Sequence, residues 1–166
     1  IQNLGYKNIV IAVNRHTAGI ELPVICELEE ALSRIPEINK PVIIELDKSL
    51  SENEIDFTHF ETFLRPPFRA DIIITLNAHL VYALMGLLRK RKLRVPQDIA
   101  LISFEEGAGF DFMLYPVTCL RKPLPSIATK TANMIWSEIK NSGKGKFKRQ
   151  VNVVPELVIR NSCGTL

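Results

Sequence analysis

The chain has 166 residues, of which 46% are hydrophobic, and a formal net charge of +3 at pH 7. This length predicts one domain with a sizeable core, and no apolar run approaches the roughly 20 residues that a membrane-spanning helix needs. The small charge gives no argument for nucleic-acid binding, and no basic-then-apolar signal segment stands at the front. The three cysteines, without CxxC spacing, favour reduced thiols and a cytoplasmic location. The three histidines lack metal-ligand spacing, so we expect neither a metal nor another cofactor.

The first third of the chain predicts a strand, a helix and a second strand. The apolar run Ile9–Val13 is typical of a strand that helices cover on both faces, and Val42–Leu46 is predicted as the next strand. We expect the helix between them to hold Pro23 in its first turn. Its apolar stripe contains Ile25, Leu28, Leu32 and Ile35.

A polar connection, Asp47–Glu54, leads to a segment rich in aromatic residues. Its three phenylalanines recur at helical spacing, which predicts a helix over Ile55–Leu64 that ends before Pro66. No basic residues alternate with the aromatic ones, so we expect these rings in the core rather than stacked on nucleic-acid bases.

The stretch from Ala70 to Glu106 organises the prediction, because it contains a strand, a helix and another strand. Ile72–Ile74 form a continuous apolar run, Asn77 can cap the next helix, and Ile99–Ile102 begin a strand after Pro96, which we expect to stop the helix. The helix has five apolar residues on one face: Leu80, Val81, Leu84, Leu87 and Leu88. Such a unit is right-handed, so both strands end on the same edge of a parallel sheet, where open α/β sheets bind ligands.

The remainder predicts a short strand at Val117–Arg121, a helix at Pro125–Asn141, a basic loop at Ser142–Lys148 and two last strands, Val151–Val154 and Leu157–Ile159. One side of that helix is apolar and contains Ala128, Ala132, Ile135, Trp136 and Ile139. The predicted fold is α/β: a doubly wound, mainly parallel sheet flanked by helices. The strands near Ile9–Val13, Val42–Leu46, Ile72–Thr75 and Ile99–Ser103 should all be parallel.

Polar side chains gather just past the predicted strand ends. They are the candidate ligand-binding residues: Asn14, Arg15, His16, Asn77, His79, Glu105 and Glu106. Each also has a structural explanation, since Asn77 can serve only as a helix cap and His79 can be simply solvated. No catalytic residues are expected, because the chain lacks a G-x-S-x-G elbow and a Walker loop, and the adjacent Glu105 and Glu106 are not paired across a site.

The chain resembles the sensor domain of lactose-repressor/galactose-repressor-type transcription regulators. The residues that show this are the strand ending in Asn77, the segment R-V-P-Q-D-I-A-L-I-S-F-E-E (Arg94–Glu106), and four shorter matches. These matches are L-G-Y-K-N-I (Leu4–Ile9), Y-P-V-T (Tyr115–Thr118), L-R-K-P (Leu120–Pro123) and P-E-L-V-I-R-N-S-C (Pro155–Cys163). They cover nearly the whole chain in order, which is a specific signal.

The resemblance implies the C-terminal lobe of a periplasmic-binding-protein-like sensor. Residues 1–166 would form one effector-binding and dimerisation domain, in which about residues 118–140 belong to the other lobe in relatives. The DNA-binding helix-turn-helix would lie outside these residues. DNA would be a partner only through that helix-turn-helix, and not through residues 1–166. The implied partners are a small polar effector, such as a sugar, and a second copy of the chain; no membrane is involved. Because the apolar stripe of the Pro125–Asn141 helix would lack its usual partner, we expect a dimer rather than a compact monomer.

The candidate site departs from the family pattern at three places. The usual Asn-Asp pair is Asn77-Ala78, the usual Gly-Phe-Asp-Asp is Ser-Phe-Glu-Glu ending in Glu106, and no arginine stands near Val24, where an R-x-x-G motif would fall. Glu105 occupies the ligand-binding Asp position. A simple hexose or purine therefore does not carry over from the resemblance.

Two other functions fit parts of the sequence. A periplasmic or receptor-type sugar-binding protein would share the lobe but lack the DNA-binding role, and a secretion signal upstream would indicate it. An unrelated doubly wound nucleotide-binding enzyme would need a phosphate-binding loop that the sequence does not show.

Overall fold

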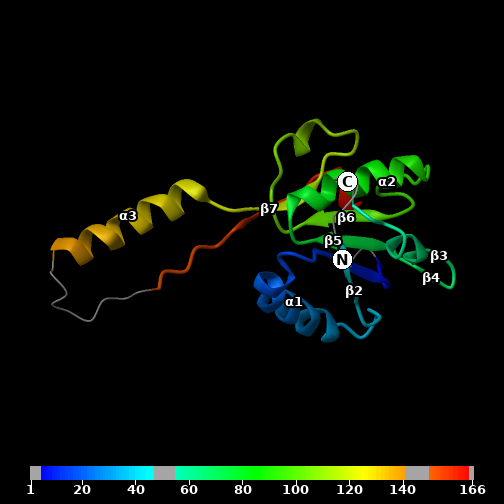
Figure 1. The fold of residues 1–166 in the computed structure, drawn as a ribbon, viewed down its shortest axis with the longest axis horizontal. Helices are drawn as coiled ribbons and strands as arrows, with labels where there is room; N and C mark the ends of the chain where they lie inside the picture. The colour runs from blue at the N-terminus through cyan, green and yellow to red at the C-terminus, as the bar shows by residue number, and fades with distance from the viewer. Residues whose placement is uncertain (1–4, 47–54, 141–149, 165–166) are drawn as a thin grey trace.

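The computed structural model describes residues 5–46, 55–140 and 150–164, and its centre is a six-stranded sheet (Figure 1). The strand order is β2-β1-β5-β6-β7-β8, in which the first five strands are parallel and β8 is antiparallel to β7. Their bounds are β1 Ile9–Asn14, β2 Val42–Leu46, β5 Ile72–Thr75, β6 Ala100–Ser103, β7 Thr118–Arg121 and β8 Glu156–Val158. The predicted fold class and the four parallel strands are confirmed.

Helices α1 (Ala18–Ser33) and α2 (Ala78–Lys90) cover opposite faces of this sheet (Figure 1). Alternate residues of each strand point to opposite faces, so each face has its own apolar cluster. Ile11 and Ile74 pack with α1, whereas Ile73 packs with α2. All five residues predicted for the apolar face of α2 are buried. The central strands are thus apolar on both sides, as their continuous apolar runs predicted.

The prediction of a helix over Ile55–Leu64 is wrong. The structure has a 3₁₀ turn at Phe60–Phe63 and a short hairpin, β3 (Leu64–Arg65) and β4 (Phe68–Arg69). Helical spacing of phenylalanines also fits a compact turn, and here the rings meet edge to face at 6.1 Å between Phe57 and Phe60. Phe60 is completely buried, which confirms the core role predicted for these aromatics.

Two predicted helix boundaries and one predicted strand are also wrong. Helix α1 begins at Ala18, because backbone N–H groups already bond to the Thr17 carbonyl, and Pro23 therefore lies in its second turn. Helix α2 ends at Lys90, well before Pro96. The helix ends there because Lys92 adopts a left-handed backbone conformation, with a φ of 58°. Val151–Val154 is not a strand. The predicted segments Asp47–Glu54 and Ser142–Lys148 lie outside the described residues.

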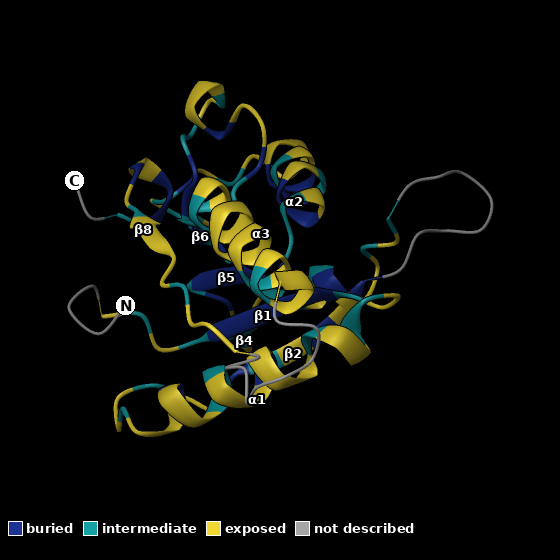
Figure 2. Cartoon of the chain, turned by 90° about the vertical axis from the view of Figure 1, so that its left-hand side faces the viewer, coloured by how far each residue is buried: buried dark blue, intermediate teal, exposed yellow. Residues whose placement is uncertain are grey.

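Helix α3 (Leu124–Lys140) projects away from the sheet (Figure 1). None of its residues is buried, and its surface is almost entirely exposed in Figure 2. Ile135, Trp136 and Ile139 are 56%, 58% and 64% exposed. The apolar stripe predicted for this helix is therefore present and does not fold back onto the sheet. Within the described ranges, no helix is long and apolar enough to cross a membrane.

Two glycines allow a matched test of the packing beside α2. A Cβ at Gly107 would overlap the Phe110 ring and lie 2.6 Å from the Tyr82 hydroxyl, whereas a Cβ at Gly86, in the middle of α2, would meet nothing within 4 Å. We expect Gly107→Ala to lower the free energy of unfolding by about 1–3 kcal/mol. Gly86→Ala should raise it by about 0.5–1 kcal/mol, because alanine favours the helix. Urea unfolding followed by circular dichroism measures both, and equal effects would contradict this packing.

Candidate ligand-binding site

Three of the predicted site residues lie at one edge of the sheet because of its register. Ala12 pairs with Thr75 and Thr75 with Ser103 across β1, β5 and β6. Asn14, Asn77 and Glu105 each follow one of these residues by two positions. These three residues therefore follow the carboxyl ends of neighbouring parallel strands, which is where open α/β sheets bind ligands.

Asn77 and Glu105 both accept hydrogen bonds from the first turn of α2. The Asn77 Oδ1 atom accepts from the Leu80 N–H at 3.1 Å, which confirms the predicted cap. Glu105 Oε2 accepts from the Ala78 N–H at 3.2 Å. The partial positive charge at the N-terminus of a helix attracts a carboxylate, which helps to hold the Glu105 side chain at this position.

The second oxygen of Glu105 contacts a residue that the sequence analysis missed. Lys122 Nζ donates to Glu105 Oε1 at 3.3 Å, and the two side chains are 57% and 40% exposed. Lys122 directly follows β7, so the same criterion of polar residues just past strand ends would have found it. The contact is open to solvent, and a ligand with hydroxyl or amino groups can replace the lysine on the carboxylate.

Asn14 and three further candidates, Arg15, His16 and His79, lie at the surface of the same edge. Asn14 Oδ1 accepts from the His16 N–H at 2.9 Å, and its carbonyl accepts from Thr17, so Asn14 shapes the turn between β1 and α1. Arg15 and His16 are exposed on that turn, and His79 is exposed in the first turn of α2. The fold thus brings these side chains to the predicted edge.

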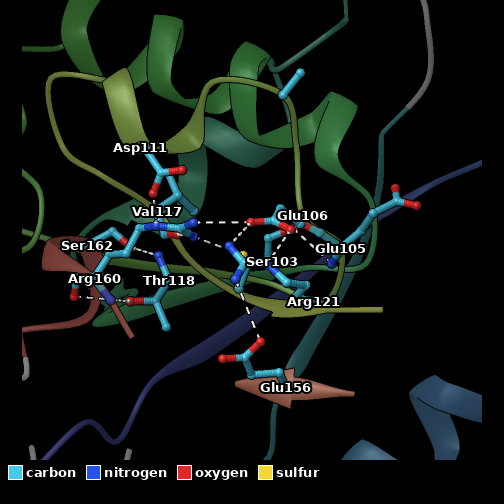
Figure 3. A network of polar contacts seen from close by, with 12 residues as sticks. Ser103, Glu105, Glu106, Asp111, Val117, Thr118, Arg121, Glu156, Arg160 and Ser162 are labelled. Atoms are coloured by element: carbon cyan, nitrogen blue, oxygen red, sulfur yellow. Dashed lines mark hydrogen bonds and ion pairs between the residues drawn. The ribbon is translucent and has the colours of Figure 1, made fainter. Parts of the chain in front are cut away.

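Glu106 differs from its neighbour, because both of its oxygens are held by arginines (Figure 3). Arg121 donates to Glu106 Oε2 and Oε1 at 2.7 Å each, and Arg160 donates to Oε1 at 3.1 Å. The bonds from Arg121, and then that from Arg160, lower the pKa of Glu106 to about 2 despite partial burial. Both oxygens of Glu106 are thus already bonded within the protein, so Glu106 is not among the residues proposed to bind a ligand.

Arg160 is the centre of this network and is only 8% exposed. Its Nε donates to Asp111 at 2.6 Å, and its Nη1 donates to the Val117 carbonyl at 2.7 Å and lies 3.1 Å from Cys119 Sγ. A buried charge is tolerated only when it is paired and hydrogen-bonded, and every nitrogen of this guanidinium has a partner.

Ser162 joins the same C-terminal segment to the sheet (Figure 3). Its hydroxyl donates to the Leu101 carbonyl at 2.6 Å and accepts from the Thr118 N–H at 2.9 Å. Thr118 in turn donates its hydroxyl to the Arg160 carbonyl at 3.1 Å. These bonds fix β6, β7 and the segment around Arg160 as one unit beside the candidate site.

An apolar groove of about 430 Å³ lies elsewhere, between the C-terminal half of α2 and residues 113–115. Its apolar lining includes Tyr82, Met85, Leu93, Met113 and Leu114, and Arg89, Lys92 and Arg94 also line it. None of the predicted site residues lines this groove. Among the residues that the structure describes, no group of three or more histidines, cysteines or carboxylates could hold a metal ion.

Comparison with known proteins gives a family match over residues 3–163, to the model described as periplasmic binding protein-like domain. One relative, "HTH-type transcriptional repressor PurR" of Histophilus somni (strain 2336), is 31% identical over 46% of this chain and 22% of its own length. "HTH-type transcriptional regulator DegA" of Bacillus subtilis (strain 168) is 28% identical over 57% of this chain and 27% of its own length.

Solved structures show the same fold. A LacI family transcriptional regulator from Enterococcus faecium with bound ribose matches with a TM-score of 0.76 and 16% identity. The match covers 99% of this chain and 59% of that one. A LacI family regulator from Arthrobacter sp. FB24 in complex with lactose has a TM-score of 0.75 and 15% identity, over 97% and 58% of the two chains. The chain therefore spans little more than half the length of these structures.

The adjacent carboxylates Glu106 and Glu105 provide a stability test. Glu106→Gln should lower the free energy of unfolding at pH 7 by about 2 kcal/mol, because charge-assisted hydrogen bonds to two arginines are lost. Glu105→Gln should cost less than about 1 kcal/mol, because its pair with Lys122 is exposed to solvent.

The lowered pKa of Glu106 predicts how the stability of the protein depends on pH. Because the folded-state pKa of Glu106 lies below its ordinary value of 4.5, this stabilisation is complete above about pH 4.5 and is lost as pH falls towards 2. Urea unfolding at a series of pH values should therefore show a shallower acid loss of stability in Glu106→Gln than in the parent. Parallel curves would remove Glu106 from the stabilising network.

Proposed function

This chain belongs to the periplasmic binding protein-like domain family, and on that premise we propose that it is the C-terminal lobe of an effector-sensing domain in a transcription regulator. The regulator would be of the lactose-repressor/galactose-repressor type, as the sequence resemblance already indicated. The observation that supports the proposal best is the polar edge at the strand ends, where the register brings Asn14, Asn77 and Glu105 together.

The proposed effector is a small polar molecule such as a sugar. A sugar presents hydroxyl groups, and each hydroxyl that is buried on binding needs a hydrogen-bond partner. The edge offers a carboxylate, two amides and cationic groups for this purpose. The proposed ligand-binding set contains Asn14, Arg15, His16, Asn77, His79 and Glu105. Two of the structures to which this chain is similar contain ribose and lactose, which supports the choice of ligand class.

The proposed domain organisation assigns α3 to the other lobe of a two-lobed sensor. Its apolar stripe is exposed here, and about 40% of each matched structure has no counterpart in this chain. An effector between the lobes would bias their closure, and closure would reset the spacing of two DNA-binding heads in a homodimer. DNA contact would come only through a helix-turn-helix outside these residues, in a cytoplasmic protein. The proposal gives the chain no catalytic role.

A periplasmic or receptor-type sugar-binding protein is the second candidate, because the family description and the polar edge fit it equally well. The coding sequence upstream distinguishes the two: a helix-turn-helix supports the regulator, and a secretion signal supports the binding protein.

Loss of the Glu105 carboxylate should weaken effector binding in the full-length protein. A thermal-shift screen of pentoses, hexoses and disaccharides, including ribose and lactose, first identifies the sugar that raises Tm most. Calorimetric titration of that sugar should then show an affinity roughly 10–150-fold lower for Glu105→Ala, since a charge-assisted bond contributes about 1.5–3 kcal/mol. Glu37→Ala, at an exposed position in the turn after α1, is the control. Equal affinity in parent and Glu105→Ala would remove Glu105 from the site, and no hit in the screen would count against a sugar effector.

The isolated 166-residue chain should associate through α3. Burying Ile135 and its neighbours against a second copy recovers about 1.5 kcal/mol or more for each large side chain. Sedimentation across a micromolar dilution series should show a dimer, and the emission of Trp136 should shift to the blue as it forms. Ile135→Glu should raise the dissociation constant at least about tenfold without altering the fold, because Ile135 is exposed.

Leu114→Glu provides the matched variant in the apolar groove, where Leu114 is 78% exposed. Dissociation by Leu114→Glu alone would place the contact at the groove instead of α3. A monomer at all concentrations, with unshifted Trp136 emission, would contradict association altogether.

A further inference from the structure

Two consecutive carboxylates that follow β6 face two consecutive cations at the end of β7. Figure 3 shows the carboxylates Glu105 and Glu106 and the first of the cations, Arg121. Glu106 pairs with Arg121, and Glu105 pairs with Lys122. The pairs connect the same two strand ends, yet their surroundings are different.

The inner pair is fixed. Arg121 donates two bonds of 2.7 Å to Glu106, the nearly buried Arg160 holds the same carboxylate, and Arg121 also lies 3.6 Å from Glu156 on β8. The outer pair is a single contact of 3.3 Å between exposed groups. Water or a ligand can therefore replace Lys122 on Glu105 while the inner pair stays intact.

The outer pair is also next to the start of α3. Only Pro123 separates Lys122 from Leu124, the first residue of the helix, and the Leu124 N–H donates to the Lys122 carbonyl at 2.8 Å. The Ile127 N–H donates to the Pro123 carbonyl at 3.0 Å. The first turn of α3 is thus hydrogen-bonded to the two residues whose position the Glu105–Lys122 contact constrains.

We propose that the Glu105–Lys122 pair is a releasable latch that sets the direction in which α3 leaves the sheet. The Glu106–Arg121–Arg160 network is the fixed pivot about which that direction changes. Lys122 is a positioning residue in this scheme: a molecule that binds Glu105 displaces the lysine, and the first turn of α3 is released with it. Only this last step, the link to an effector, rests on the proposed function.

The chain contains the probes needed to test the latch. Trp136, on α3, is its single tryptophan. Cys26, on α1, is exposed, whereas Cys119 and Cys163 are buried, so a thiol reagent labels Cys26 selectively. Time-resolved energy transfer from Trp136 to an aminonaphthalene label on Cys26 then measures the distribution of distances between α3 and the body. An excess of unlabelled Trp136→Phe chain suppresses transfer between copies.

Lys122→Gln and Glu105→Gln should both shift this distance distribution in the same direction. The ratio of the populations with the pair formed and with the pair broken should change by up to about fivefold, because an exposed ion pair contributes no more than about 1 kcal/mol. The double variant should shift it no further than either single variant, because both remove one interaction. High salt should move the parent towards the variants, since it screens the exposed pair. Lys90→Gln, at the distant end of α2, should leave the distribution unchanged.

Other outcomes would overturn the proposal. An unchanged distribution in both single variants, or an equal change in Lys90→Gln, would mean that the pair does not direct α3. Additive shifts in the double variant would mean that the two residues act separately. Circular dichroism verifies that each variant is folded. The measurement uses neither effector nor DNA, so the latch and the proposed function can fail independently of each other.

Discussion

The burial of β1, β5 and β6 on both faces is the constraint on which the rest of the structure depends. Apolar side chains on both sides of a strand require a cover on each face, and α1 and α2 supply it. Parallel strands with helical crossovers meet this requirement, and such a sheet gathers all its carboxyl ends at one edge. The polar residues that follow the strands then have no freedom to lie elsewhere. A hydrophobic constraint thus determines the location of a polar site.

The same constraint explains what the sequence could predict. The strand–helix–strand unit around Asn77 has unambiguous periodicity, so its elements and the edge containing Glu105 followed from local pattern and handedness. The helix over Ile55–Leu64 was wrong because three phenylalanines at helical spacing equally suit a 3₁₀ turn and hairpin that pack onto the same core. Lys122 directly follows β7, so its place at the same edge also follows from local pattern.

The role of Glu106 could not be predicted from local pattern. Its partner Arg160 lies 54 residues further along the chain, and nothing near either residue indicates that they meet. Adjacent glutamates look equivalent in the sequence, yet one is held by two arginines and the other accepts from a backbone N–H of α2 and from an exposed lysine. The distinction arises from tertiary structure, in which the buried guanidinium of Arg160 needs acceptors and Glu106 lies within reach.

The position of the single tryptophan has a consequence for how the unfolding of this protein is observed. Trp136 lies on α3, outside both apolar clusters, so its emission responds to the surroundings of that helix and not to the packing of the sheet. Far-ultraviolet circular dichroism, by contrast, records every helix and strand. A fluorescence curve and a dichroism curve would then differ even if the sheet unfolds in one cooperative step. Such a mismatch, usually taken as a sign of a folding intermediate, would here reflect two separate structural elements.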